Sequence, residues 1–151
     1  MKLPAELLKQ QFHLKLIRGA IIRFEFDAFL DPKKKTPGPK FAVVLNRADV
    51  SDPIYLALTT SKVEPYDKVA QFKSVVIVLE AGEYACWPVR TAIPFRADPV
   101  GVPRAKLEQQ FLDQRLSFVG TLTEVHVDRM NAIITGSPFI RSNLKPFLLS
   151  S

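Results

Sequence analysis

Gly-Ala-Ile-Ile-Arg-Phe-Glu-Phe-Asp, residues 19–27, is the stretch that decides the fold class, because its apolar side chains recur at every second position. Ile22, Phe24 and Phe26 alternate with charged residues. A period of two is typical of a β-strand that has one buried face. The sequence therefore predicts a strand whose aromatic side chains point into a core, in a fold built around a sheet.

The segments at the two ends of the chain predict helices. Residues 4–13 begin with Pro4, which suits a first helical turn, and carry a partial apolar stripe. Residues 103–112 show a second amphipathic pattern. The capping box Thr121–Glu124 precedes a third pattern, which ends at Gly136. We therefore expect an N-terminal helix and C-terminal helices around the sheet.

Apolar runs rich in β-branched residues predict the other strands. These strands are expected at Phe41–Leu45, Ile54–Thr60, Phe72–Leu79, Tyr84–Phe95 and Ser117–Leu122. A hairpin turn is expected at residues 80–83, and loops are expected at residues 61–67 and 96–102. Short turns between consecutive strands imply a mostly antiparallel sheet. We expect one domain over residues 1–151, mainly β with helices, as a small barrel of about five to six strands.

The composition is that of a globular protein with excess positive charge. Lys and Arg number 21 against 15 Asp and Glu, which gives a formal net charge of +6, and 47% of the residues are hydrophobic. These values exclude a disordered chain and favour an anionic partner such as a nucleic acid. The single cysteine excludes an intrachain disulfide and a multi-cysteine zinc site.

The sequence carries no motif for a cofactor or a membrane anchor. It lacks a Walker loop, a Gly-rich dinucleotide turn and a nucleophile elbow, so we expect no cofactor and no metal. No apolar run approaches the ~18 residues of a membrane span, and residues 1–12 lack the apolar stretch of a signal peptide. We therefore expect a cytoplasmic protein without membrane contact.

Two segments are candidates for binding phosphate. Residues 32–40 combine Pro and Gly with Lys33, Lys34 and Lys35, which predicts an exposed basic loop. These lysines either clamp phosphates or only keep the loop solvated. Thr59–Lys62 ends a predicted strand, and its hydroxyls and ammonium either hydrogen-bond a phosphate or reflect the preference of threonine for strands.

Three other reactive side chains have ordinary structural interpretations. His13 and His126 lie on predicted helices near opposite ends of the chain, where partly exposed histidines are common. Cys86 falls inside a predicted strand, as a small buried hydrophobic residue would. None of the three is expected to be a catalytic group.

Short motifs in a fixed order resemble the PemK/MazF family of type II toxins. They are Arg18–Asp27, Lys40–Asn46, Leu56–Lys62 and Val89–Ile93, followed by Val119–Thr123 before the final helix. The resemblance covers about residues 18–135. It implies an SH3-like barrel and a toxin of a toxin–antitoxin system. Such a toxin is a homodimeric, metal-independent endoribonuclease that cleaves single-stranded RNA and is neutralised by an antitoxin protein.

The resemblance also implies which residues form the site. Lys40, which stands where the family usually has Arg, and Arg90 would stabilise charge on the phosphate. Thr59 or Thr60 would position the sugar; the register of the match leaves both open. Further RNA contacts would come from the basic loop, the end of the third strand and an aromatic ring. These residues are Lys33, Lys34, Lys35, Lys62 and Trp87.

A second hypothesis keeps the barrel without the chemistry. Some family members carry Arg and Asp at the positions that match Ala85 and Trp87, and neither residue acts as an acid or a base. The chain would then be a catalytically inactive module that binds nucleic acid or protein. An exposed Trp87 would stack on a base without cleaving the strand.

Overall fold

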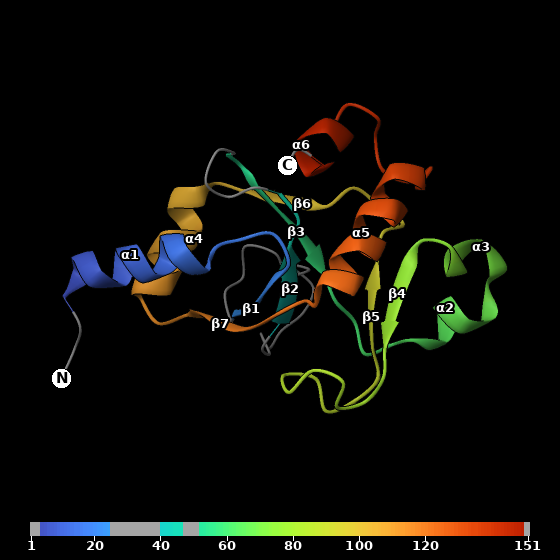
Figure 1. Cartoon of the computed structure of the whole chain (residues 1–151), viewed down its shortest axis with the longest axis horizontal. Helices are drawn as coiled ribbons and strands as arrows, with labels where there is room; N and C mark the ends of the chain where they lie inside the picture. Colours follow the sequence, from blue (N-terminus) through green and yellow to red (C-terminus); the bar gives the residue numbers. More distant parts are fainter. Residues whose placement is uncertain (1–3, 25–39, 47–51, 150–151) are drawn as a thin grey trace, which may run out of the picture.

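The computed structural model describes residues 4–24, 40–46 and 52–149, in which seven strands form two antiparallel sheets (Figure 1). The strands are β1 (Ala20–Phe24), β2 (Lys40–Val44), β3 (Ile54–Leu58), β4 (Val76–Leu79), β5 (Thr91–Pro94), β6 (Val100–Val102) and β7 (Leu116–Thr121). Five of them form a sheet in the order β6-β3-β2-β1-β7, and β4 pairs with β5. A bridge between Thr60 and Ala92 joins the two sheets.

Helices cover both faces of the five-stranded sheet (Figure 1). The described helices are α1 (Ala5–Lys15), α2 (Glu64–Lys68), α3 (Ala70–Lys73), α4 (Arg104–Leu112), α5 (Glu124–Gly136) and α6 (Lys145–Leu149). Helices α1 and α4 pack on one face of this sheet and α5 on the other, whereas α2 and α3 pack against the two-stranded sheet. The expected mixed fold is confirmed, with an antiparallel sheet, an N-terminal helix and C-terminal helices. No helix in the described ranges is long and apolar enough to cross a bilayer.

Strand β1 shows the predicted alternation over residues 22–24, and its beginning is buried on both faces. Ile21 and Val43 pack into a core shared with the second sheet and α5. Ile22 and Phe24 pack on the opposite side against α1 and α4, through residues such as Phe12. Arg23, between Ile22 and Phe24, is only partly buried, so the second face of β1 is apolar at Ile21 and polar at Arg23. Residues 25–27 lie outside the described ranges.

Two segments that were expected to be loops contain regular structure. Residues 64–68 form α2, in which Pro65 occupies the first turn, where a missing backbone N–H costs nothing. Residues 100–102 form β6, which pairs with β3. A Cβ on Gly101 would lie 3.1 Å from the ring of Tyr55, so glycine permits this close pairing.

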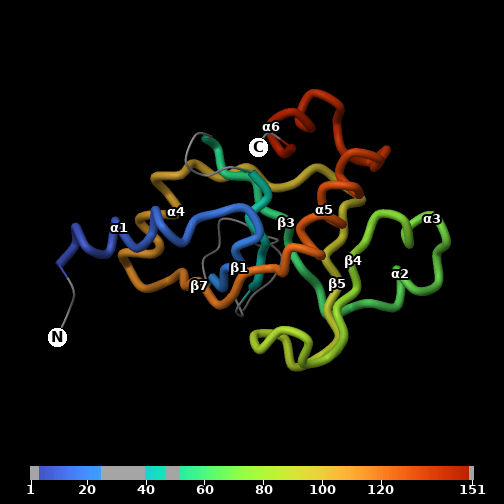
Figure 2. The backbone as a smooth tube through the Cα atoms, viewed as in Figure 1, coloured from blue at the N-terminus to red at the C-terminus, as the bar shows by residue number. Residues whose placement is uncertain are grey.

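The long strand expected over Tyr84–Phe95 is wrong, because only Thr91–Pro94 is a strand. Residues 80–90 instead form a long connection between β4 and β5, here called loop 80–90 (Figure 2). Its internal hydrogen bonds run from Gly82 N–H to Trp87 O and from Trp87 N–H to Tyr84 O, both 3.0 Å. Pro88 cannot donate a ladder hydrogen bond, which is consistent with the chain leaving the sheet here.

The C-terminal region folds largely as expected, with a shifted helix cap. Thr123, and not Thr121, is the N-cap of α5, and its Oγ1 accepts a hydrogen bond from His126 N–H. The tail beyond α5 packs onto the body through Leu148, which is fully buried. The Arg18 side chain donates hydrogen bonds to Leu148 O and to Asn131 Oδ1, which ties the tail and α5 to the start of β1.

Candidate functional site

An open cavity of about 350 Å³ lies where the ends of β2 and β3 face loop 80–90. One side, here called the sheet wall, consists of Lys40, Phe41, Thr59, Thr60, Ser61 and Lys62. The opposite side, the loop wall, consists of Cys86, Trp87, Pro88 and Val89, with Thr91 beside it. Most of the described residues predicted for the site therefore line one cavity: Lys40, Thr59, Thr60, Lys62 and Trp87. Lys33, Lys34 and Lys35 lie outside the described residues.

Strand register brings the two lysines and the threonines of the sheet wall together. The antiparallel pairing of β2 and β3, with Ala42 opposite Leu58, places Lys40 beside the threonines that follow β3. Thr60 then continues into the second sheet, since its N–H donates to Ala92 O and its carbonyl accepts from Ala92 N–H. The sheet wall is thus built on hydrogen-bonded backbone, which holds its side chains in place.

The two threonines offer different hydrogen-bonding groups to a ligand. Thr59 Oγ1 donates to Phe41 O at 3.2 Å, so its proton is already used. Thr60 Oγ1 accepts from Lys62 N–H at 3.1 Å, which leaves its proton available as a donor. A phosphate or sugar oxygen requires a donor. Thr60 is therefore the better candidate of the two that the sequence left open.

Arg90 does not line the cavity. Its Nη1 lies 2.9 Å from Asp67 Oδ2, and its Nε lies 3.3 Å from Glu80 Oε2. The hydrogen bond with Asp67 raises the pKa of the Arg90 guanidinium. Two carboxylates thus already neutralise this cation, whereas Lys62 forms no ion pair with any carboxylate in the described part of the chain.

Trp87 lines the cavity but is not the exposed platform that the sequence predicted. Its side chain is only 4% exposed, because it packs edge-on against Phe41 at 6.1 Å and Tyr84 at 5.7 Å between ring centroids. The neighbouring Cys86 lies in loop 80–90 and not in a strand. It is half-buried, and this burial raises the pKa of its thiol.

The charge at the cavity is positive. Among the described residues that line it, Lys40 and Lys62 carry charge, and none has a carboxylate or an imidazole. No cluster of three or more His, Cys, Asp or Glu side chains that could hold a metal lies within the described ranges. The lining can thus bind an anion through ammonium and hydroxyl groups, while its described side chains include no carboxylate or imidazole that could act as a general base.

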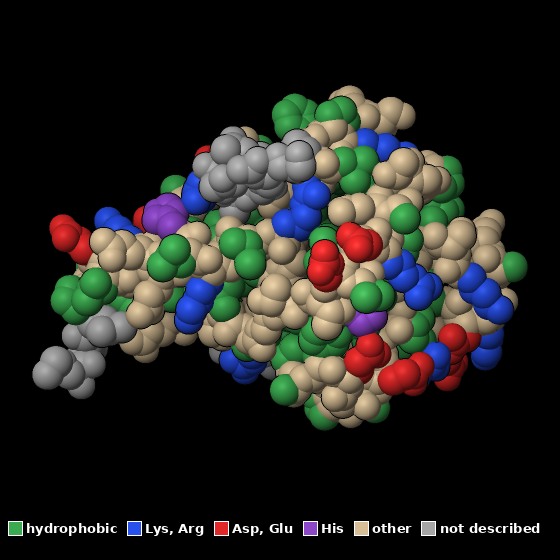
Figure 3. Space-filling view, viewed as in Figure 1, with side chains coloured by type: hydrophobic (Ala, Val, Ile, Leu, Met, Phe, Trp, Pro, Cys, Tyr) green, Lys and Arg blue, Asp and Glu red, His purple; other side chains and the backbone are tan. Residues whose placement is uncertain are grey.

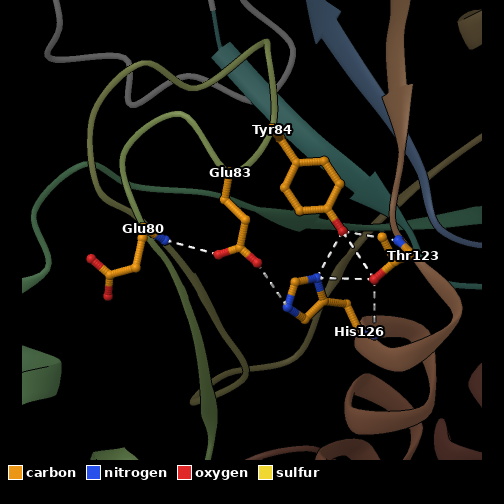
Figure 4. A network of polar contacts seen from close by, with 5 residues as sticks. All are labelled: Glu80, Glu83, Tyr84, Thr123 and His126. Atoms are coloured by element: carbon orange, nitrogen blue, oxygen red, sulfur yellow. Dashed lines mark hydrogen bonds and ion pairs between the residues drawn. The ribbon is translucent and has the colours of Figure 1, made fainter.

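A polar network that the sequence did not predict lies behind the loop wall (Figure 4). His126 Nδ1 is 2.7 Å from the Tyr84 hydroxyl, and its Nε2 is 3.4 Å from Glu83 Oε2. Thr123 N–H donates to the same hydroxyl at 2.9 Å. Acidic side chains gather beside a histidine on this face of the molecule (Figure 3). No local pattern reveals the network, since Tyr84 and His126 are 42 positions apart.

Comparison with protein-family models gives no match for this chain, and neither does comparison with curated proteins. The resemblance to the PemK/MazF family therefore rests on the sequence motifs and their order alone.

Proposed function

We propose that this chain binds single-stranded RNA in the cavity between the sheet wall and the loop wall, as a toxin-like relative of the PemK/MazF family. The observation that carries the proposal is the pairing of Lys40 and Lys62 with the hydroxyls that follow β3 around one open cavity. Ammonium groups gain free energy on a phosphate backbone by releasing its counterions. The formal net charge of +6 acts in the same direction over longer distances.

The dimensions of the cavity favour a single strand. Its volume of about 350 Å³ is at the low end of small-ligand pockets, which span roughly 300–1,000 Å³. Such a space suits one nucleotide of an unpaired strand and not a duplex. Hydroxyl groups at the wall favour RNA over DNA, because they can exchange hydrogen bonds with the ribose 2′-hydroxyl.

Metal-independent cleavage of the bound RNA is the second candidate function. Two ammonium groups and the Thr60 donor at one cavity would stabilise the charge that develops on a phosphate during cleavage. The described lining lacks a carboxylate or imidazole to move the proton of the attacking 2′-hydroxyl. Binding is therefore the primary proposal. An antitoxin partner and a homodimeric state are carried with it as further parts of the family resemblance.

Fluorescence anisotropy tests the proposal with a labelled short single-stranded RNA, the DNA of the same sequence and the corresponding RNA duplex. We expect the single-stranded RNA to bind most tightly, with an affinity that falls as salt rises. Equal binding of the three probes, or none, would contradict the proposal. The same RNA, incubated with the protein in EDTA and analysed on a gel, separates binding from cleavage.

A further inference from the structure

Four side chains fasten loop 80–90 to the beginning of α5, and together they are called the latch: Glu83, Tyr84, Thr123 and His126 (Figure 4). The Tyr84 hydroxyl is the central group of the latch. It accepts from Thr123 N–H at 2.9 Å and lies 2.7 Å from His126 Nδ1. The latch thus joins residues that are 39 to 43 positions apart in the chain.

Every polar group of the latch has a partner. The Tyr84 hydroxyl accepts from the Thr123 backbone N–H and also forms a hydrogen bond of 2.7 Å with His126 Nδ1. The other ring nitrogen of His126, Nε2, faces Glu83 Oε2 at 3.4 Å. The other oxygen of Glu83 accepts from Glu80 N–H at 3.1 Å. Both ends of the latch are therefore anchored to backbone groups, and the His126 side chain is only 17% exposed.

The latch is mechanically connected to the cavity through Trp87. The ring of Tyr84 meets the ring of Trp87 edge-on at 5.7 Å, and Trp87 N–H donates to Tyr84 O at 3.0 Å. Trp87 is in turn part of the loop wall, with Cys86 and Pro88 on either side of it. A displacement of Tyr84 would therefore move the loop wall relative to the sheet wall.

We propose that Tyr84 and His126 are positioning residues for RNA binding, which hold the loop wall at the separation from the sheet wall that an RNA strand requires. This inference rests on the proposed function of the cavity. Neither side chain lines the cavity, so both act through Trp87 and its neighbours. The residues that contact RNA belong to the walls, and the latch determines the shape of the space between them.

The experiment uses Trp87, the sole tryptophan of the chain, as a spectroscopic reporter. Tyr84→Phe removes the central hydroxyl and keeps the ring. We expect a red-shifted emission, stronger quenching by acrylamide and an RNA affinity lower by up to about fivefold for one lost hydrogen bond, because the loop wall then occupies the RNA-binding position for a smaller fraction of the time. Tyr55→Phe is the matched control, since the Tyr55 hydroxyl makes no hydrogen bond within the described residues.

Two substitutions of His126 separate the two halves of the latch. His126→Asn places an amide near the position of Nδ1 and can still form a hydrogen bond with the Tyr84 hydroxyl, so it is expected to retain most of the emission and the affinity. His126→Gln places its amide near the position of Nε2 and loses the Tyr84 contact, so it is expected to behave like Tyr84→Phe. Far-UV circular dichroism identifies any variant that fails to fold. Such a variant is set aside, and the folded variants then test whether the latch positions the loop wall.

The outcomes distinguish the latch from the proposed function. Wild-type emission, quenching and affinity in Tyr84→Phe would overturn the inference, and so would equal behaviour of the Asn and Gln variants. An exposed Trp87 with unchanged RNA affinity would also overturn it, because the loop wall would then move without consequence. A third outcome separates the two proposals: the wild-type protein does not bind RNA, but Tyr84→Phe exposes Trp87. The latch would then hold loop 80–90 in place, while the proposed RNA binding would be wrong. The positioning role would be wrong with it, because there would be no RNA to position.

Discussion

The two walls of the cavity are held in place by different means. The sheet wall stands on paired backbone, as the hydrogen bonds of Thr60 with Ala92 illustrate, and its lysines and hydroxyl-bearing residues line the cavity. The loop wall belongs to a connection without regular structure, and the packing of its own buried Trp87 holds it in place. Trp87 packs against Phe41 and Tyr84. The sheet wall therefore provides the polar groups of the cavity, and the loop wall determines the shape of the cavity.

This difference predicts that substitutions in the two walls will have different consequences. A polar group on a hydrogen-bonded strand end can be removed without disturbing the fold, so its loss should appear in binding. A buried ring that supports an irregular loop cannot be removed in this way, so its loss should appear first in stability.

Replacing the buried tryptophan should produce the largest effect. Trp87→Ala removes a side chain that is 4% exposed, and truncation of a buried aromatic ring costs roughly 3–5 kcal/mol. We expect the free energy of unfolding to fall by about 3 kcal/mol, as measured by urea denaturation followed by circular dichroism. The matched control is Val89→Ala in the same loop, where the side chain is 54% exposed and a change within about 0.5 kcal/mol is expected. A stable Trp87→Ala protein that has lost its RNA affinity would show instead that this ring serves mainly as a stacking platform.

Removing the charge of Lys62 should mainly affect binding. Lys62→Gln takes one ammonium from the sheet wall. We expect RNA affinity to fall about fivefold, and the slope of log affinity against log salt to become shallower by about 0.7, the value for one phosphate contact on a single strand. Anisotropy titrations at several salt concentrations provide both quantities, and the unfolding curve should remain that of the wild type.

Lys106→Gln is the matched charge control, because Lys106 is exposed on α4 and does not line the cavity. Both variants lower the net charge by the same amount. An equal loss of affinity in the two would mean that RNA responds to overall charge and not to the cavity.

The sequence predicted the sheet wall better than the loop wall for a physical reason. The strand at Phe41–Leu45 and the polar end of β3 follow from local patterns of apolar and β-branched residues, and the pairing of neighbouring strands brings them together. Loop 80–90 depends on contacts with partners far along the chain, since Tyr84 hydrogen-bonds to residues 39 and 42 positions away. Such contacts leave no trace in a local pattern, and the apolar run was therefore interpreted as one strand.

The interpretation of Arg90 was incomplete for the same reason. Its cationic side chain is evident from the sequence, but its partner Asp67 belongs to a short helix that the sequence presented as a polar loop. The three-residue strand β6 likewise acquires its structure from pairing with β3 and not from its own composition. Helices and strands with a strong local periodicity could be predicted from the sequence. Whether Arg90 is paired with a carboxylate could not, because its partners come from other parts of the fold.

Arg90→Gln should consequently affect RNA binding less than Lys62→Gln. Asp67 and Glu80 already neutralise the Arg90 guanidinium, and an exposed, compensated charge contributes little. We expect a change in RNA affinity of less than about twofold, measured in the same anisotropy titration. A loss as large as that in Lys62→Gln would show that the arginine exchanges its carboxylate partners for phosphate when RNA binds.

The smallest effect concerns Cys86, which reports on how firmly the loop wall is packed. Burial raises the pKa of this thiol, so the reactive thiolate is scarcer at neutral pH than in the unfolded chain. We expect iodoacetamide to alkylate Cys86 more slowly in the folded protein than in urea, with a rate that rises as the pH approaches the raised pKa. Mass spectrometry measures the rate.

The folded state binds the Cys86 proton more tightly than the unfolded chain does. The resulting contribution to the free energy of unfolding is fully present below the pKa of the unfolded thiol, and it is lost as the pH rises through the pKa of the folded thiol. Equal rates in the folded and unfolded protein would mean that the loop wall opens freely, and the contrast between the two walls would then not hold in solution.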